Sequence, residues 1–159
     1  MAQDQDKAIT TFFKLFSQFE YCLKITGYCT TGRSNEAKPD WTTFAKALEH
    51  QLMDSTDAAV QEAVKYMLDD PPKKQVFEEK KLDWRKVAPQ TDDDNDRILI
   101  YVRRVRNNLF HGGKFNGRFL DPDRSFDLLK HSEAILMECI FNSEQMLEAY
   151  ENNSFTKQQ

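Results

Sequence analysis

The apolar residues of this chain recur at intervals of three and four over most of its length, and this periodicity constrains the fold more than any other feature. In the first segment, apolar residues at these intervals run from Ile9 to Leu23. The pattern predicts a helix over residues 4–26, and Gly27 is a suitable place for it to end. The phenylalanines of this segment would also suit a platform for stacked bases, but aromatic residues at helical spacing are typical of a core.

Two shorter helices are expected next. Asp40 is a suitable N-cap for the first of them, because aspartate side chains accept hydrogen bonds from the free amides of a first turn. Thr56 or Asp57 can cap the second. Pro71 and Pro72 end it, because proline lacks a backbone donor and disfavours a helical residue before it.

Two longer helices are expected in the second half of the chain. One covers about residues 94–111, and Gly112 directly follows it. The final helix covers about residues 124–152, with Asp123 or Ser125 as its cap.

Residues 73–94 show no clear period. We expect a long connection with at most one helical turn, pinned to the body by its apolar side chains, which are Phe77, Leu82, Trp84 and Val87. No segment alternates as a strand would, and five Gly and five Pro are few for an all-β fold. The sequence therefore predicts a single all-α domain over residues 1–159, a bundle of about five helices.

Composition argues against several classes of protein. No apolar run approaches the roughly 18 residues of a membrane span, and the polar start MAQDQDK lacks a secretion signal, so we expect a cytoplasmic protein. The three cysteines, Cys22, Cys29 and Cys139, lack the spacing of zinc ligands and are expected to be reduced thiols. The acidic residues at 92–96 could hold a metal ion, but they precede a helix whose N-terminus favours acids. We therefore expect no metal and no cofactor.

Charge is unevenly distributed along the chain. The net charge is −4, yet the segment from Arg97 to Leu120 contains six basic residues and no acidic one. The remainder has 16 basic and 26 acidic residues. A local positive region in an acidic protein suits a phosphate group bound at one place.

The helix expected at 94–111 has apolar residues on the side that should face solvent. These residues are Leu99, Ile100 and Phe110, and we expect them to form an interface with a second copy of the chain.

Polar residues are interleaved with them. Arg103, Asn107 and His111 stand four residues apart and therefore line one side, with Arg106 beside the row. A guanidinium, an amide and an imidazole suit a bound phosphate. A solvated basic face that ends in a histidine is an equally good interpretation of the periodicity.

The string Arg106-Asn107-Asn108-Leu109-Phe110-His111 resembles the signature of HEPN domains (higher eukaryotes and prokaryotes nucleotide-binding). That signature is an arginine, often followed by asparagine, and then a histidine after four to six intervening residues. Here four residues intervene. The context is similar too, because a loop and a final long helix follow, and the similarity extends over about residues 94–150.

The resemblance implies a helical bundle that dimerises along the motif helix. Many members are metal-independent endoribonucleases that act as toxins or other defence effectors, and it implies an antitoxin or another defence-system protein as a partner. Arg106 and His111 would be the catalytic pair, with Asn107 supporting them. Some toxin members carry a tyrosine two residues after the histidine, which an antitoxin modifies with AMP. Gly113 stands at that position here, so that form of neutralisation is not implied.

The chemistry of these residue types suits RNA, which carries its own nucleophile in the 2′-OH. A neutral His111 can take the 2′-OH proton, and Arg106 can stabilise charge on the phosphorus, leaving a 2′,3′-cyclic phosphate and a 5′-OH. The second subunit's His111 is a candidate for the acid that protonates the leaving group. Flanking phosphates would be held by Arg103, Arg104, Lys114 and Arg118.

Two other hypotheses stay open. One is a non-catalytic HEPN module that binds a nucleotide or a protein partner through the same cleft. The other is a helical interaction domain in which the motif is accidental. The intact arginine–histidine pair favours catalysis, whereas the net acidity favours the binding module, because free ribonucleases often have a more positive surface.

Overall fold

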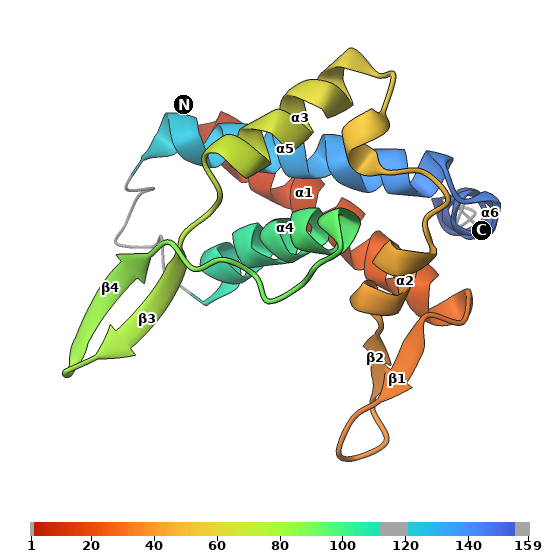
Figure 1. Ribbon diagram of the computed structural model, residues 1–159, viewed down its shortest axis with the longest axis horizontal. Helices are drawn as coiled ribbons and strands as arrows, with labels where there is room; N and C mark the ends of the chain where they lie inside the picture. The colour runs from red at the N-terminus through yellow and green to blue at the C-terminus, as the bar shows by residue number, and fades with distance from the viewer. Residues whose placement is uncertain (1, 112–120, 155–159) are drawn as a thin grey trace.

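The computed structural model of the chain describes residues 2–111 and 121–154. These residues form six α-helices, one short 3₁₀ helix and two β-hairpins (Figure 1). The helices are α1 (Ala2–Ile25), α2 (Trp41–Ala47), α3 (Ala58–Asp69), α4 (Asp94–Phe110), α5 (Pro122–Phe141) and α6 (Glu144–Ser154). The fold is thus mostly helical, as expected, but it is not purely all-α.

Most ends of the first four helices agree with the signals in the sequence. The apolar spacing extends the second helix to Leu48 and Leu52, but α2 ends at Ala47 and Leu52 begins a separate 3₁₀ helix, Leu52–Asp54. The side chains of Asp40, Asp57 and Asp93 accept hydrogen bonds from amides in the first turns of α2, α3 and α4. Gly27 follows α1 with a φ of 96°, a left-handed conformation that glycine adopts without steric strain. The predicted boundaries of the helix that carries the motif are confirmed within one residue by α4.

The last part of the chain differs from the single helix expected over residues 124–152. The capping side chain is that of Asp121, not Asp123 or Ser125, and a proline occupies the first helical position. α5 ends at Phe141, and α6 begins at Glu144, with Asn142 and Ser143 between the two helices. Apolar spacing continues across this break, which is why the periodicity did not reveal it.

The expectation that no strand is present was wrong. β1 (Cys29–Thr31) pairs with β2 (Ala37–Pro39), and β3 (Lys74–Glu78) pairs with β4 (Lys81–Arg85), both antiparallel. The turn between β3 and β4 holds Glu79 and Lys80 at φ values of 49° and 62°. Positive φ at both central residues is typical of a type I′ turn, which usually carries asparagine or glycine. The two charged residues here gave no such signal.

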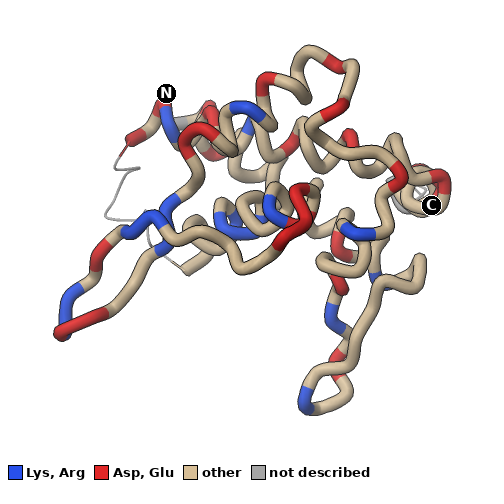
Figure 2. Tube along the Cα trace, in the orientation of Figure 1, with Lys and Arg blue, Asp and Glu red and all other residues tan. Residues whose placement is uncertain are grey.

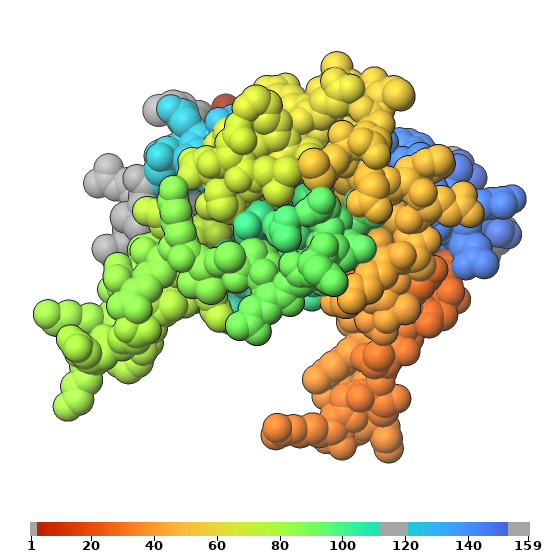
Figure 3. Space-filling model, viewed as in Figure 1, coloured from red at the N-terminus to blue at the C-terminus, as the bar shows by residue number. Residues whose placement is uncertain are grey.

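The β3–β4 hairpin also contradicts the expectation that the apolar residues of the connection pin it to the body. Phe77 and Leu82 are each 68% exposed, and Val87 is 40% exposed. Figure 3 shows the hairpin standing out from the helical body on the left, while the β1–β2 hairpin projects on the right. Both hairpins are therefore appendages to a helical core.

The buried apolar side chains form one cluster, to which every α-helix contributes. α1 and α3 pack on α5, while α4 packs against α2, α3, α5 and the 3₁₀ helix at Leu52–Asp54. Leu99 is fully buried in this cluster, so its expected place at a subunit interface was wrong. The physical reason is that several elements enclose α4, so its core side is wider than the arc assumed from the sequence.

Buried hydrogen bonds fix the start of α4. The fully buried Asn95 accepts a hydrogen bond from the amide of Leu52 at 2.8 Å and donates to the carbonyl of His50 at 3.3 Å. Because an unpaired amide in the core would be costly, these bonds hold α4 in one position against the segment after α2.

Two general features accompany this core. In the described residues, none of the helices combines the length and apolar character needed to cross a membrane. Cys22 and Cys139 are buried and Cys29 is exposed, all three as free thiols. Burial raises the pKa of the Cys22 and Cys139 thiols, which therefore pack as small apolar groups.

Candidate functional site

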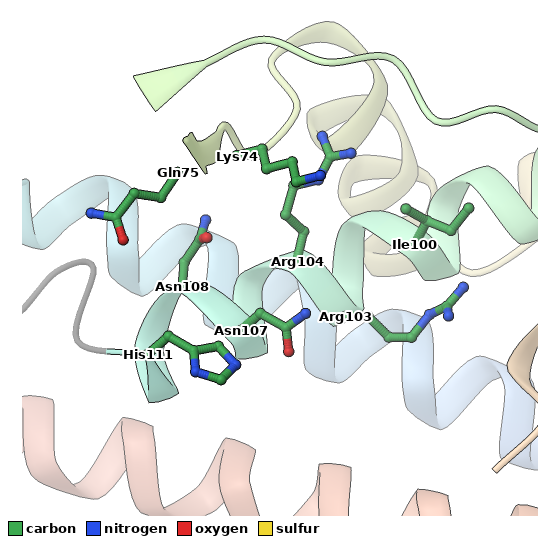
Figure 4. Close-up of a pocket in the computed structure, with 8 residues that line it drawn as sticks. All are labelled: Lys74, Gln75, Ile100, Arg103, Arg104, Asn107, Asn108 and His111. Carbon is green, nitrogen blue, oxygen red and sulfur yellow. The ribbon is translucent and has the colours of Figure 1, made fainter. Parts of the chain in front are cut away.

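An open pocket of about 510 Å³ runs along one side of α4 (Figure 4). The row predicted from the sequence, Arg103, Asn107 and His111, lines it from one end to the other. Ile100 and two further residues of α4, Arg104 and Asn108, also line it. Its other wall is the start of β3, with Lys74 and Gln75. The structure thus brings the predicted row together in one cavity.

The lining of this pocket is positively charged. Among the described residues that line it, three are cations, Lys74, Arg103 and Arg104, and none is a carboxylate. Figure 2 shows basic residues along α4 and at the base of the β3–β4 hairpin. In a chain whose net charge is −4, this concentration of positive charge favours an anionic ligand at this place.

Arg103 is fixed at one end of the pocket. Its guanidinium lies 3.6 Å from the buried carboxylate of Asp96 and 5.5 Å from the ring centroid of Trp41. The same carboxylate accepts a hydrogen bond of 3.1 Å from the Thr42 hydroxyl. Burial lowers the pKa of the Arg103 guanidinium, and the charges of Asp96 and Glu20 partly offset this effect. An arginine pairs with a carboxylate as a cation, so it stays charged here.

The other two members of the row are exposed. Asn107 is accessible on the last turns of α4, and His111 is the residue that caps this helix. The backbone amide of His111 donates to the carbonyl of Asn107 at 3.0 Å, so the imidazole continues directly from the helix. Its position is therefore set by helical structure while its ring stays open to a ligand.

Arg104 directly follows Arg103 and Asn108 directly follows Asn107, but the side chains of Arg104 and Asn108 bind the backbone of another segment. Arg104 donates hydrogen bonds to the carbonyls of Pro72, at 3.3 Å, and Val87, at 2.8 Å. Asn108, which is 8% exposed, donates to the carbonyl of Lys73 at 2.8 Å. These carbonyls flank the β3–β4 hairpin at both ends. The two side chains therefore fasten the hairpin to α4, and in Figure 4 both point toward it.

Arg106, the expected partner of His111, does not line the pocket. Its guanidinium carbon lies 4.8 Å from the ring centroid of Phe110 and 5.6 Å from that of Phe16. It donates a hydrogen bond of 3.1 Å to the side-chain oxygen of Asn107. Arg106 thus stands beside the pocket and is joined to it through the amide of Asn107.

The other residues expected at a subunit interface have separate surroundings. Ile100 is partly buried and lines the pocket. Phe110 is 49% exposed, and its ring centroid lies 5.2 Å from that of Phe13, which is 44% exposed. Two phenylalanines from α1 and α4 therefore form an exposed aromatic pair next to Arg106.

Several residues singled out from the sequence lie outside the described residues. They are Gly112, Gly113, Lys114 and Arg118. The expectation that Lys114 and Arg118 hold phosphates therefore stays a prediction.

Three residues of the pocket were not predicted from the sequence, namely Lys74, Gln75 and Asn108. Lys74 and Gln75 come from a segment expected to be irregular, so nothing in the sequence linked them to the motif. Asn108 did carry a signal, because it stands four residues after Arg104 just as Asn107 stands four after Arg103. A second row beside the first could have been recognised from this repetition.

The described residues contain no group of three or more His, Cys, Asp or Glu side chains arranged to hold a metal ion. Comparison with known proteins gives no assignment: no family model matches the chain, and no curated protein and no solved structure matches it. The case for a function therefore depends on the residues of this pocket and on the motif.

Proposed function

We propose that this protein is a HEPN-type endoribonuclease that cleaves RNA without a metal ion, as a toxin or defence effector. The observation that supports this proposal is the pocket along α4, where the exposed His111 and Asn107 stand among three cations. Its volume of about 510 Å³ is in the range of small-molecule sites and suits a nucleotide. A pocket lining that has cations and no carboxylates suits the phosphates of RNA.

In the proposed reaction, the imidazole of His111 takes the proton from the 2′-OH of the bound nucleotide. The 2′ oxygen then forms a bond to the adjacent phosphorus, and the bond from phosphorus to the 5′ oxygen breaks. An acid protonates the departing 5′ oxygen. The products are a 2′,3′-cyclic phosphate and a 5′-OH, so neither water nor an external nucleophile is consumed in this step.

Arg106 would stabilise the negative charge that develops on the phosphoryl oxygens. For this role the scissile phosphate would lie at the His111 end of the pocket, within reach of the guanidinium across Asn107. The hydrogen bond from Arg106 to Asn107 supports the proposal that Asn107 orients the arginine. Arg103 and Lys74, which line other parts of the pocket, would bind a neighbouring phosphate.

The proposal includes a homodimer, in which the partner's His111 would supply the acid. The exposed Phe110 and its neighbour Phe13 favour an interface on this side of α4. Replacement of Phe110 by aspartate should yield monomers in light scattering and abolish cleavage. Phe141→Asp is the matched control, because Phe141 is 60% exposed at the end of α5 and should not affect assembly. A folded and active Phe110→Asp monomer would contradict the dimer.

The direct test of the activity is to incubate the purified protein with RNA in the presence of EDTA. Cleavage is expected for the wild type and should be lost in His111→Ala. His50→Ala is the matched control, since the His50 side chain is exposed and does not line this pocket. Cleavage that requires a divalent metal, or that persists in His111→Ala, would refute the proposal.

One observation favours a second candidate, a non-catalytic module that binds a nucleotide or a protein partner. Arg106 stands outside the pocket lining, so a bound phosphate could be held by Lys74 and Arg103 without contact with Arg106. The same preparation separates the two candidates. Saturable binding of a nucleotide with no cleavage of any RNA would favour the binding module.

A further inference from the structure

The β3–β4 hairpin has one apolar face. Gln75 pairs with Trp84 and Phe77 pairs with Leu82 across the hairpin, and because directly paired residues share a side, all four lie on one face. Phe77 and Leu82 are each 68% exposed, and Trp84 is partly exposed. Large apolar side chains this exposed on a two-stranded hairpin indicate a surface that a ligand covers.

The same hairpin is basic. Residues 73–86 contain six basic and three acidic residues within a chain of net charge −4. Arg85 is paired with Glu78 at 2.7 Å and with Asp83 at 3.5 Å. Lys74, at the base of the hairpin, has no carboxylate within ion-pair distance in the part of the chain that the structure describes. Positive charge therefore lies at both ends of the hairpin, at Lys74 beside the pocket and at Lys80 and Lys81 near the turn.

The apolar face and the pocket along α4 are continuous. Gln75 belongs to both, since it pairs with Trp84 and also lines the pocket. Arg104 and Asn108 fasten the ends of the hairpin to α4, so this continuity is held by hydrogen bonds to the backbone. Trp84 lines a second pocket of about 440 Å³, which shares Asn108 with the first, so the two pockets adjoin at the base of the hairpin. A ligand that leaves the first pocket beside Gln75 would reach Phe77 and Trp84 on this side.

We propose that the β3–β4 hairpin is a second contact for single-stranded RNA, which extends the binding site beyond the pocket. Bases next to the cleavage site would stack on Trp84 and Phe77, and Lys74 would bind a phosphate between the pocket and the hairpin. Exposed aromatic side chains beside unpaired lysines are the combination that binds single strands without sequence preference. This inference rests on the proposed function.

The β1–β2 hairpin has neither the exposed aromatic residues nor the unpaired lysine of the β3–β4 hairpin. β1 and β2 carry threonine, cysteine, alanine, lysine and proline, with no aromatic residue. Lys38 on β2 is paired with Glu36 at 3.6 Å. Neither strand lines the pocket. Lys38 is therefore a matched control for Lys74.

The test compares two RNA lengths in the His111→Ala background, in which binding is measured without cleavage. A fluorescent trinucleotide reports the pocket alone, whereas a dodecanucleotide also reaches the hairpin. The dodecanucleotide should bind more tightly, and the double substitution Phe77→Ser and Leu82→Ser, or Trp84→Ala alone, should weaken its binding by about tenfold. Binding of the trinucleotide should not change in these variants.

Charge gives a second measurement that does not depend on the aromatic residues. Lys74→Ala should reduce the salt dependence of dodecanucleotide binding by about one phosphate contact, whereas Lys38→Ala should leave it unchanged. Phe141→Ser, which removes a comparably exposed phenylalanine, should bind both RNAs as the parent does.

The proposal is overturned if the hairpin variants bind the dodecanucleotide as the parent does. It is also overturned if they change the oligomeric state but not RNA affinity, because the face is then a protein interface. If the wild type cleaves RNA and the hairpin variants keep the parent's affinity for the dodecanucleotide, the RNA contact of the hairpin is refuted and the proposed function is not. If the parent binds neither RNA and the wild type does not cleave RNA, both the hairpin contact and the proposed function are refuted.

Discussion

Arg103 and Asn107 stand four residues apart in α4, and so do Arg104 and Asn108 one position later. The side chains of the two pairs nevertheless make different contacts. One guanidinium nitrogen of Arg104 and the side-chain amide of Asn108 donate to three backbone carbonyls that flank the β3–β4 hairpin. Asn107 is exposed to the pocket together with His111. The same residue types thus form a fastening in one row and a candidate site in the other, and the difference lies in their partners.

A polar row on a helix thus becomes a candidate site only where it leaves groups open to a ligand, as Asn107 and His111 are here, whereas Arg103 at the other end of the row is paired with Asp96. The occupied row has a structural use that is complete within the chain. The open row shows no such use for Asn107 beyond its contact with Arg106. Variants of the exposed Asn107 and His111 should therefore affect activity, and variants of Arg104 and Asn108 should affect stability.

The largest effect is expected at Arg106, which is joined to the open row through Asn107. Arg106→Lys keeps the charge but loses the planar fork of donors, and the cleavage rate should fall by about a hundredfold. Single-turnover kinetics measure this loss, with the melting temperature as a check on folding. An Arg106→Lys variant with wild-type rates would show that the arginine is not part of the chemistry.

A matched pair of substitutions tests the comparison itself. Asn108→Ala removes the donor to the carbonyl of Lys73, and the free energy of unfolding should fall by about 1 kcal/mol. Asn107→Ala should change it by less than about 0.5 kcal/mol, because the side chain is exposed. Urea denaturation gives both values, and cleavage assays should show the larger loss for Asn107→Ala. The reverse pattern would break the distinction between the rows.

The smallest effect concerns His131, a histidine that, unlike His111, is enclosed. It is 5% exposed, and its ring centroid lies 4.4 Å from that of Tyr66. Burial lowers the pKa of the His131 imidazole, and the charges of Glu62 and Asp127 only partly offset this.

The unfolded chain therefore binds a proton at His131 more readily than the folded chain does. Stability should fall as the pH decreases from about 6.5, the ordinary pKa of histidine, and level off below the lowered pKa of the folded state. Melting temperatures between pH 7.5 and 5.5 measure the effect. His131→Gln should lose this part of the pH dependence, and an unchanged profile in that variant would assign it to other groups.

Periodicity and capping residues predicted most of the helical body. Asp40, Asp57 and Asp93 cap helices as their side chains allow, and α4 has the expected length. The hairpins could not be predicted, because Glu79 and Lys80 adopt left-handed conformations without being typical turn residues. The break after α5 was missed because the apolar spacing continues across Ser143.

The candidate site was predictable only along α4. Spacing alone placed Arg103, Asn107 and His111 on one side, and the structure brings them together in one pocket. Spacing could not reveal that Leu99 is enclosed by several elements, or that the hairpin supplies Lys74 and Gln75. Both depend on contacts between segments far apart in the sequence, which the period of a single helix does not contain.

The chemical identity of the RNA ends shows whether the 2′-OH of the substrate is the nucleophile and His111 is its base. RNA cleaved in EDTA would be analysed by mass spectrometry at both new ends. We expect 2′,3′-cyclic phosphate and 5′-OH ends from the wild type and from His50→Ala, and neither from His111→Ala. Ends that carry a 3′-OH and a 5′-phosphate, or cyclic phosphate ends from His111→Ala, would refute this mechanism.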